Sequence, residues 1–113
     1  MHELSICGSI AGIVKRHAGQ RRVTTIHLQV GQLRQIVPDT LVYCWSLVSA
    51  DTELDGSQLD VERVRAKISC QSCQRTIEIG EFPILICTHC NSTAVEVIAG
   101  EEFLITSLDL EEA

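Results

Sequence analysis

Two Cys-x-x-Cys pairs constrain this chain more than any other feature of its sequence. Cys70 and Cys73 form the first pair, Cys87 and Cys90 form the second, and thirteen residues separate the two pairs. Each pair places two sulfurs on the same side of a tight turn, and two such turns facing each other supply four thiolates to one tetrahedral ion. A hairpin-sized spacer between the pairs is typical of a zinc ribbon. The sequence therefore predicts a structural Zn²⁺ site on these four cysteines.

Two other uses of the same cysteines stay open. Iron also accepts four thiolates in a tetrahedral arrangement, and a Cys-x-x-Cys pair can cycle between dithiol and disulfide. A redox pair usually lies where a strand passes into a helix, and the residues around these cysteines do not have that pattern. Gln74 and Asn91 follow the second cysteine of each pair, where such turns often need a left-handed backbone that Asn tolerates better than Gln.

Composition and charge limit which folds and which classes of partner are compatible with this chain. With 113 residues, 45% of them hydrophobic, the chain has room for one modest core besides the metal module. The formal net charge is -6, and four thiolates on one Zn²⁺ would add a local charge of about -2. Nucleic acid is not the expected partner, because phosphate binding needs basic stripes. The sequence has only two short basic runs, Arg21-Arg22 and Arg63, Arg65, Lys67.

The sequence also indicates a compartment. The start Met1-His2-Glu3 has no basic segment of the kind that opens a secretion signal, and no apolar run approaches the roughly 20 residues of a membrane span. Paired thiols fit a reducing environment. We therefore expect a cytoplasmic protein with no membrane partner.

The hydrophobic pattern predicts an α+β fold. Apolar residues spaced by three and four indicate two helices, and alternating ones indicate strands. We expect a three-stranded sheet with two helices on one face, plus an inserted zinc-ribbon module. Residues 1–66 and 101–113 would form the α/β body, and residues 67–100 the module. The predicted helices span 3–18 and 38–50, the long strands 23–30, 59–68 and 103–110, and the short strands 76–79, 84–86 and 95–99.

A few residues of the body could carry chemistry, but each has a simpler interpretation. Cys7 and Cys44 lie on the apolar stripes of the two predicted helices, where free cysteine behaves as a small core residue. Trp45 is expected to anchor the same core. His27 alternates with apolar neighbours along its strand, so we expect it to be solvated. His17 stands near the end of the first helix, whose negative pole favours a cation.

The ordered combination of motifs resembles the HypA/HybF family of hydrogenase nickel-incorporation proteins. It consists of the opening MHELSIC, the strand ending at Gly31, the helix starting at Pro38, the two Cys-x-x-Cys pairs and the tail GEEFLITSLDLEE, and it covers nearly the whole chain. The resemblance implies a nickel metallochaperone with no enzymatic activity. It implies the GTPase HypB as a partner, the large subunit of a [NiFe] hydrogenase as the acceptor, and urease maturation proteins as a further destination in some members. We expect a monomer or a weak homodimer.

The resemblance also implies a nickel site at the amino terminus, built on His2 and separate from the zinc site. The α-amine of Met1, the backbone nitrogen of His2 and its imidazole can form fused chelate rings, and planar nitrogen donors suit Ni²⁺. A fourth donor could come from Glu3 or from elsewhere. His89, between the last two cysteines, is a polar loop residue or a group that couples the zinc site to pH. The competing class is a zinc-ribbon module that binds nucleic acid or protein.

Overall fold

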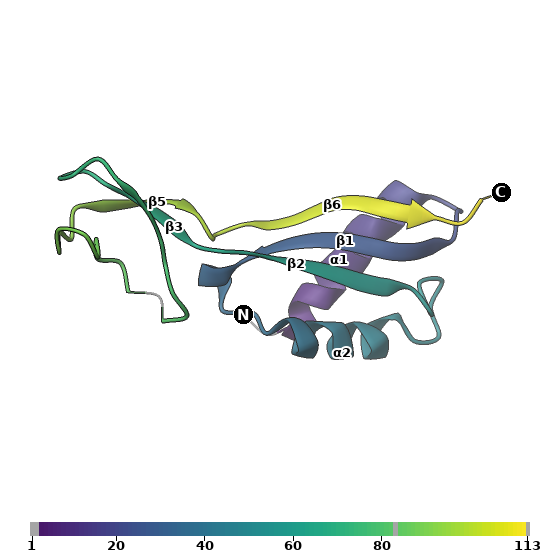
Figure 1. Cartoon of the computed structure of the whole chain (residues 1–113). Coiled ribbons are helices and arrows are strands. Elements are labelled where there is room, and N and C mark those ends of the chain that lie inside the picture. The colour runs from purple at the N-terminus through teal and green to yellow at the C-terminus, as the bar shows by residue number, and fades with distance from the viewer. Residues whose placement is uncertain (1–2, 83, 113) are drawn as a thin grey trace. The chain divides into compact units, whose positions relative to one another are not determined.

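The chain forms two compact units, each described here by itself. The computed structural model describes residues 3–82 and 84–112. The body unit contains residues 1–29, 36–62 and 104–113, and the cysteine unit contains residues 30–35 and 63–103. The boundaries at 67 and 100 that the sequence suggests for the inserted module stay a prediction. The elements, shown in Figure 1, are α1 (Glu3–Ala18), β1 (Val23–Gly31), η1 (Gln32–Arg34), α2 (Pro38–Ser49), β2 (Gln58–Val64), β3 (Lys67–Cys70), β4 (Thr76–Glu78), β5 (Val95–Ala99) and β6 (Phe103–Leu110).

Helix α1 has the apolar spacing of a helix with one face in a core. It ends at Ala18, and the following Gly19 has a left-handed φ of 61°, as is typical of a C-terminal cap. Leu4, near its start, is 54% exposed. The buried residues are Ile6, Cys7, Ile10, Ala11, Val14 and Ala18.

Helix α2 begins at Pro38, whose fixed φ suits the first turn of a helix. Leu41 and Trp45 are buried one turn apart, and the Trp45 indole N–H donates to the Ser57 hydroxyl at 3.0 Å. Ser57 in turn donates to the backbone carbonyl of Leu54 at 2.6 Å. The indole therefore fills the core while its one polar atom is satisfied.

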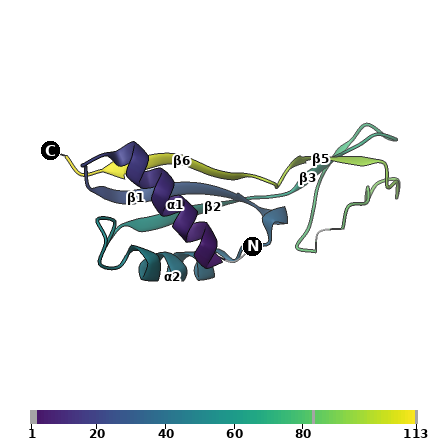
Figure 2. The same ribbon diagram turned by 180° about the vertical axis from the view of Figure 1, so that it is seen from behind.

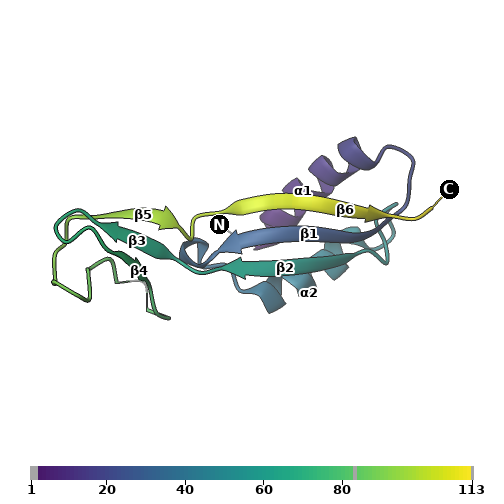
Figure 3. The same ribbon diagram turned by 45° about the horizontal axis from the view of Figure 1, so that its top comes forward.

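The sheet of the body unit has the strand order β2-β1-β6, with β1 in the centre. Side chains of β1 bond to residues 33 positions later in β2, whereas β1 and β6 pair in opposite directions, so β2 is parallel to β1 and β6 is antiparallel to it. The arrows in Figure 3 show these directions. Helix α2 lies in the connection from β1 to β2, as a parallel pair requires. Both helices cover the same face of this sheet (Figures 2 and 3), which confirms the predicted fold class.

The cysteine unit has its own sheet, in the order β4-β3-β5, and both outer strands run antiparallel to β3. Ala66, Ile68 and Ile79 are buried together as its core. Partly buried apolar side chains pack against them, from Leu33, Ile77, Val95 and Val97. This core is small, as expected for a module that relies on a crosslink.

The prediction of one strand over residues 59–68 is wrong, because two strands of different sheets lie there. β2 ends at Val64 and β3 begins at Lys67. Between them, the N–H of the fully buried Ala66 donates to the side chain of Gln32 at 2.9 Å, and its carbonyl accepts the N–H of Ile79 at 2.8 Å. The chain leaves one sheet and enters the other at Ala66.

The predicted strand over residues 84–86 is also wrong. The N–H of Ile84 donates back to the carbonyl of Phe82 at 2.8 Å, which is a turn contact. Ile84 is 61% exposed and Leu85 is 42% exposed. An apolar run predicts burial against a partner strand, and this segment forms a surface loop instead.

Candidate metal centre

The four cysteines lie in two turns built on the same backbone plan. Cys70 ends β3, and its carbonyl accepts the N–H of Gln74 at 3.0 Å, which closes the first turn. The carbonyl of Cys87 accepts the N–H of Asn91 at 2.7 Å, which closes the second. The N–H of each first cysteine also donates to a backbone carbonyl five residues later. That of Cys70 donates to Arg75 at 2.8 Å, and that of Cys87 donates to Ser92 at 3.0 Å.

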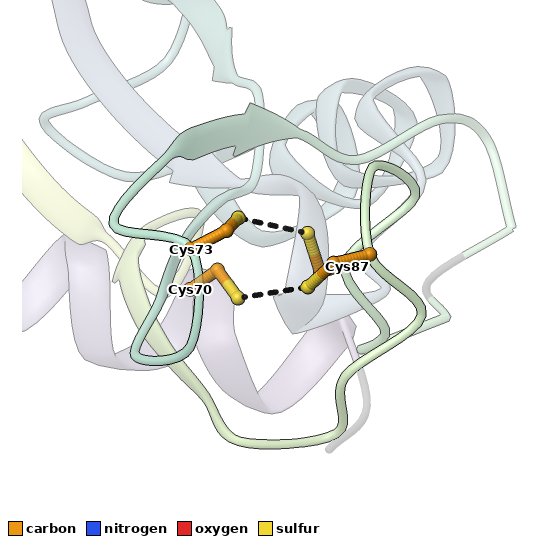
Figure 4. A group of neighbouring side chains, drawn as sticks. Cys70, Cys73 and Cys87 are labelled. Carbon is orange, nitrogen blue, oxygen red and sulfur yellow. Dashed lines mark hydrogen bonds between the residues drawn. The ribbon is translucent and has the colours of Figure 1, made fainter.

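The two turns bring all four sulfurs together. The ligand atoms of Cys70, Cys73, Cys87 and Cys90 lie within 4.8 Å of one another. The Sγ atoms of Cys70 and Cys90 are 3.6 Å apart, and those of Cys73 and Cys87 are 3.7 Å apart; Figure 4 shows side chains of the two turns pointing toward each other. A tetrahedral Zn²⁺ with Zn–S bonds of about 2.3 Å separates its sulfurs by about 3.8 Å. The donor set therefore fits a tetrahedral, thiolate-binding ion such as Zn²⁺.

These distances do not fit a disulfide. A disulfide bond holds its sulfurs about 2.05 Å apart, and all six cysteines are free. Cys7 is fully buried and Cys44 is partly buried in the body unit, as predicted for core residues. Burial is the largest cause that raises the pKa of Cys7, to about 11, followed by the nearby Cys44 thiol. A thiol with so high a pKa is a poor nucleophile.

The pKa values of Cys70, Cys73 and Cys90 are shifted by their surroundings and by one another. The backbone N–H of Cys73 is the main cause that lowers the pKa of Cys70 to about 6. Burial raises the pKa of Cys73. For Cys90 the N–H of Ser92 acts to lower the pKa, but the neighbouring thiols and burial outweigh it and raise the pKa to about 12. One thiolate opposes the next, and a divalent cation removes that repulsion.

The turns share one backbone strain that the sequence predicts. Gln74 has a φ of 63° and Asn91 a φ of 62°, both left-handed. The left-handed region costs an ordinary residue about 1–2 kcal/mol. Gln74 also donates its side-chain amide to the carbonyl of Gln71 at 3.2 Å, on the surface.

Gln74→Gly is therefore expected to strengthen metal retention about twofold. Glycine removes the strain, and its greater freedom in the unfolded chain cancels part of the gain, leaving about 0.5 kcal/mol. Competition for Zn²⁺ with a chromophoric chelator measures the effect. Asn91→Gly is the control and should change retention less, because Asn tolerates this backbone. A weaker hold on Zn²⁺ in Gln74→Gly alone would contradict the interpretation.

The residues predicted to bind nickel are only partly visible. Met1 and His2 lie outside the described residues, so the nickel site stays a prediction. Glu3 is the first residue of α1. His89 is exposed, and it does not belong to the group of four sulfurs. Within the described residues no helix is long and apolar enough to cross a bilayer.

Residues 1–110 match the family model described as "Hydrogenase/urease nickel incorporation, metallochaperone, hypA". The chain belongs to the HypA family. This confirms the resemblance inferred from the motifs. Among curated HypA relatives, "Hydrogenase maturation factor HypA" of Geotalea uraniireducens is 37% identical over 98% of this chain and 100% of its own length. The protein of the same name from Nostoc is 36% identical over 99% of this chain and 97% of its own length.

Solved HypA structures have the same fold. A "Solution structure of HypA protein" superimposes with a TM-score of 0.69 at 18% identity, covering 98% of this chain and 97% of that one. The "Solution structure of the Ni metallochaperone HypA from Helicobacter pylori" gives a TM-score of 0.66 at 19% identity, over 97% of both chains. Family membership thus places this chain among proteins of hydrogenase maturation.

One polar cluster of the body unit was not predicted. His27, expected to be solvated, bonds to carboxylates on both neighbouring strands. Alternation along one strand shows that His27 faces outward, but it does not show which residues of distant strands stand beside it.

Proposed function

We propose that this chain is a nickel metallochaperone that binds Ni²⁺ at its amino terminus and delivers it to the large subunit of a [NiFe] hydrogenase. The observation that carries the proposal is the match of residues 1–110 to a nickel-incorporation family. The four clustered cysteines support a second, structural site for Zn²⁺. When bound, Zn²⁺ crosslinks the two turns and stabilises the small cysteine unit.

The proposed nickel donors differ in kind from the zinc donors, and that difference keeps the two metals apart. Nitrogen donors from Met1 and His2 suit Ni²⁺, whereas four thiolates hold Zn²⁺. Glu3 opens α1, where the first N–H groups have no partner within the helix. Its backbone nitrogen or carboxylate is a candidate fourth donor. Donors that protonate readily and lie at the end of the chain allow release as well as capture.

The role needs partners rather than catalysis. We propose the GTPase HypB as a partner, since the sequence has no phosphate-binding G-x-x-x-x-G-K-[ST] loop of its own. Urease maturation proteins are a second destination. We place the chain in the cytoplasm, where it acts as a monomer or weak homodimer. The cysteine unit would serve as a docking surface, because Phe82 is 81% exposed and Ile84 61% exposed in its apolar loop.

The alternative, a zinc-ribbon module for nucleic acid, has less support. The cysteine unit carries as many acidic as basic side chains, and its thiolates add negative charge when they hold Zn²⁺. The basic ones are Arg34, Arg63, Arg65, Lys67 and Arg75, and the acidic ones are Glu78, Glu81, Glu96, Glu101 and Glu102.

A Ni²⁺ titration of the untagged, zinc-loaded chain tests the proposal. We expect one tight nickel equivalent, and His2→Ala should weaken it at least about tenfold, equivalent to about 1.4 kcal/mol. Zinc content should stay at one per chain in both proteins, because the donors are separate. Calorimetry with metal analysis of the same samples measures both quantities.

Two controls separate this site from adventitious binding. His17→Ala and His89→Ala each remove an exposed histidine elsewhere and should leave the tight nickel equivalent intact. Acetylation of the amino terminus should weaken binding as His2→Ala does, because it removes the amine donor. Equal nickel affinity in the parent chain and in His2→Ala would contradict the proposed nickel site at the amino terminus and favour the binding-module alternative.

A further inference from the structure

His27 connects all three strands of the body sheet. It lies at the middle of β1, and its Nδ1 is 2.9 Å from a carboxylate oxygen of Asp60 on β2. Its Nε2 is 2.9 Å from a carboxylate oxygen of Asp109 on β6. The neighbours Ile26 and Leu28 are buried toward the helices, so His27 stands on the opposite, open face.

Only one protonation state of the imidazole satisfies both contacts. A neutral imidazole has one N–H donor, and its other ring nitrogen is an acceptor. An ionised carboxylate can only accept, so beside two ionised aspartates a neutral imidazole would set two lone pairs against each other in one of the two 2.9 Å contacts. The imidazolium has two donors and serves both carboxylates. The geometry therefore selects the charged form.

The charges around His27 also favour the imidazolium form. On β2, Asp60 and Glu62 share the open face with His27, and Glu62 accepts the side-chain amide of Gln29 at 3.0 Å. On β6, Asp109 is the acid that faces it, and no helix of the described part of the chain covers this side of the sheet (Figure 3). Within the described residues, neither Asp60 nor Asp109 has another cation at ion-pair distance. The bond to Asp109 first, and that to Asp60 second, raise the pKa of His27.

We propose that His27 is a pH-operated lock of the body sheet, which holds both outer strands to the central strand as an imidazolium and releases one of them when it loses its proton. The released strand is the one facing the ring nitrogen that no longer carries hydrogen.

The position of the lock gives it a consequence beyond local stability. All three strands of the body sheet run into the cysteine unit, β1 at residues 29/30, β2 at 62/63 and β6 at 103/104. Opening the lock loosens the pairing of a strand that leads directly to that unit. The inference does not depend on nickel binding or on the proposed delivery.

The sign of the pH effect follows from the raised pKa. Because the folded pKa of His27 lies above the ordinary 6.5, its stabilisation is fully present below pH 6.5. It is lost as the pH rises through the folded pKa. The body sheet should therefore be most stable at mildly acidic pH and less stable at alkaline pH.

Nuclear magnetic resonance of the full, zinc-loaded chain tests the lock without any substitution. Imidazole ¹⁵N shifts distinguish the imidazolium from either neutral tautomer. We expect His27 to titrate above 6.5 with both ring nitrogens protonated below its midpoint, and amide protection in β2 or β6, corrected for intrinsic exchange, to fall through the same midpoint. A midpoint at or below 6.5, or protection that does not follow it, would overturn the proposal.

Variants then assign the contacts. Asp109→Asn and Asp60→Asn should each lower the His27 midpoint, and Asp109→Asn more, since its bond is the stronger cause. His27→Gln should remove the loss of thermal stability that accompanies the rise of pH above 6.5. His17→Gln, exposed on α1, is the matched control and should keep it. An unchanged pH profile in His27→Gln would show that the histidine has only a structural role.

Discussion

Cys70→Ser is expected to abolish zinc binding and unfold the cysteine unit while the body unit stays folded. The core of this unit is a small cluster around Ala66, Ile68 and Ile79, so the unit depends on the metal crosslink. Structural Zn²⁺ contributes about 10–16 kcal/mol to small zinc modules, and serine does not replace a thiolate at such a site. Zinc content should fall from one to less than about a tenth per chain.

The unfolding should be confined to one unit, and that is its decisive signature. Hydrogen exchange should show lost protection in β3, β4 and β5, with α1 and α2 unchanged. Cys44→Ser is the matched control, because Cys44 is a partly buried cysteine of the body unit outside the metal group. A Cys70→Ser protein that keeps one zinc and the protection of β3 would contradict the assignment, as would zinc loss in Cys44→Ser.

Excess chelator should reproduce the same pattern in the unmodified chain. Protonation of the thiolates competes with the metal, so zinc release should become easier as the pH falls. This direction is opposite to that of the His27 lock, which loosens as the pH rises. The two processes are therefore distinguishable in one pH series.

Trp45→Ala is expected to destabilise the body unit by about 3–5 kcal/mol. The side chain is only 2% exposed, and its indole N–H bonds to Ser57 in the interior. Truncation leaves a large cavity and removes a partner from a buried hydroxyl. A loss of this size is a large fraction of the stability of a small domain.

Denaturant unfolding of the zinc-loaded chain, followed by far-ultraviolet circular dichroism, measures this loss. Tyr43→Ala is the control on the same helix, because Tyr43 is 64% exposed, and it should change the free energy of unfolding by no more than about 0.5 kcal/mol. Trp45→Phe should fall between the two. Equal effects of Trp45→Ala and Tyr43→Ala would show that α2 does not pack as described.

Local pattern was sufficient for most of the fold. The spacing of apolar residues located α1 and α2, because each helix buries one stripe of its own sequence. The metal centre could also be predicted from local pattern, since the geometry of a Cys-x-x-Cys turn positions its two sulfurs independently of the rest of the chain. The failures lie at Ala66 and at Ile84, where the choice between strand and loop depends on which partner is available.

The sequence by itself determined the helices, two of the three strands of the body, the four thiolates and the family. Each of these depends on residues close together in the chain or on an ordered set of motifs. Only the tertiary structure decided that the Gln32 side chain accepts the N–H of Ala66. It alone also decided that His27 bonds to carboxylates 33 and 82 residues away. Strand order and register set those neighbours, and they arise from packing between distant segments, on which the alternation within a single strand carries no information.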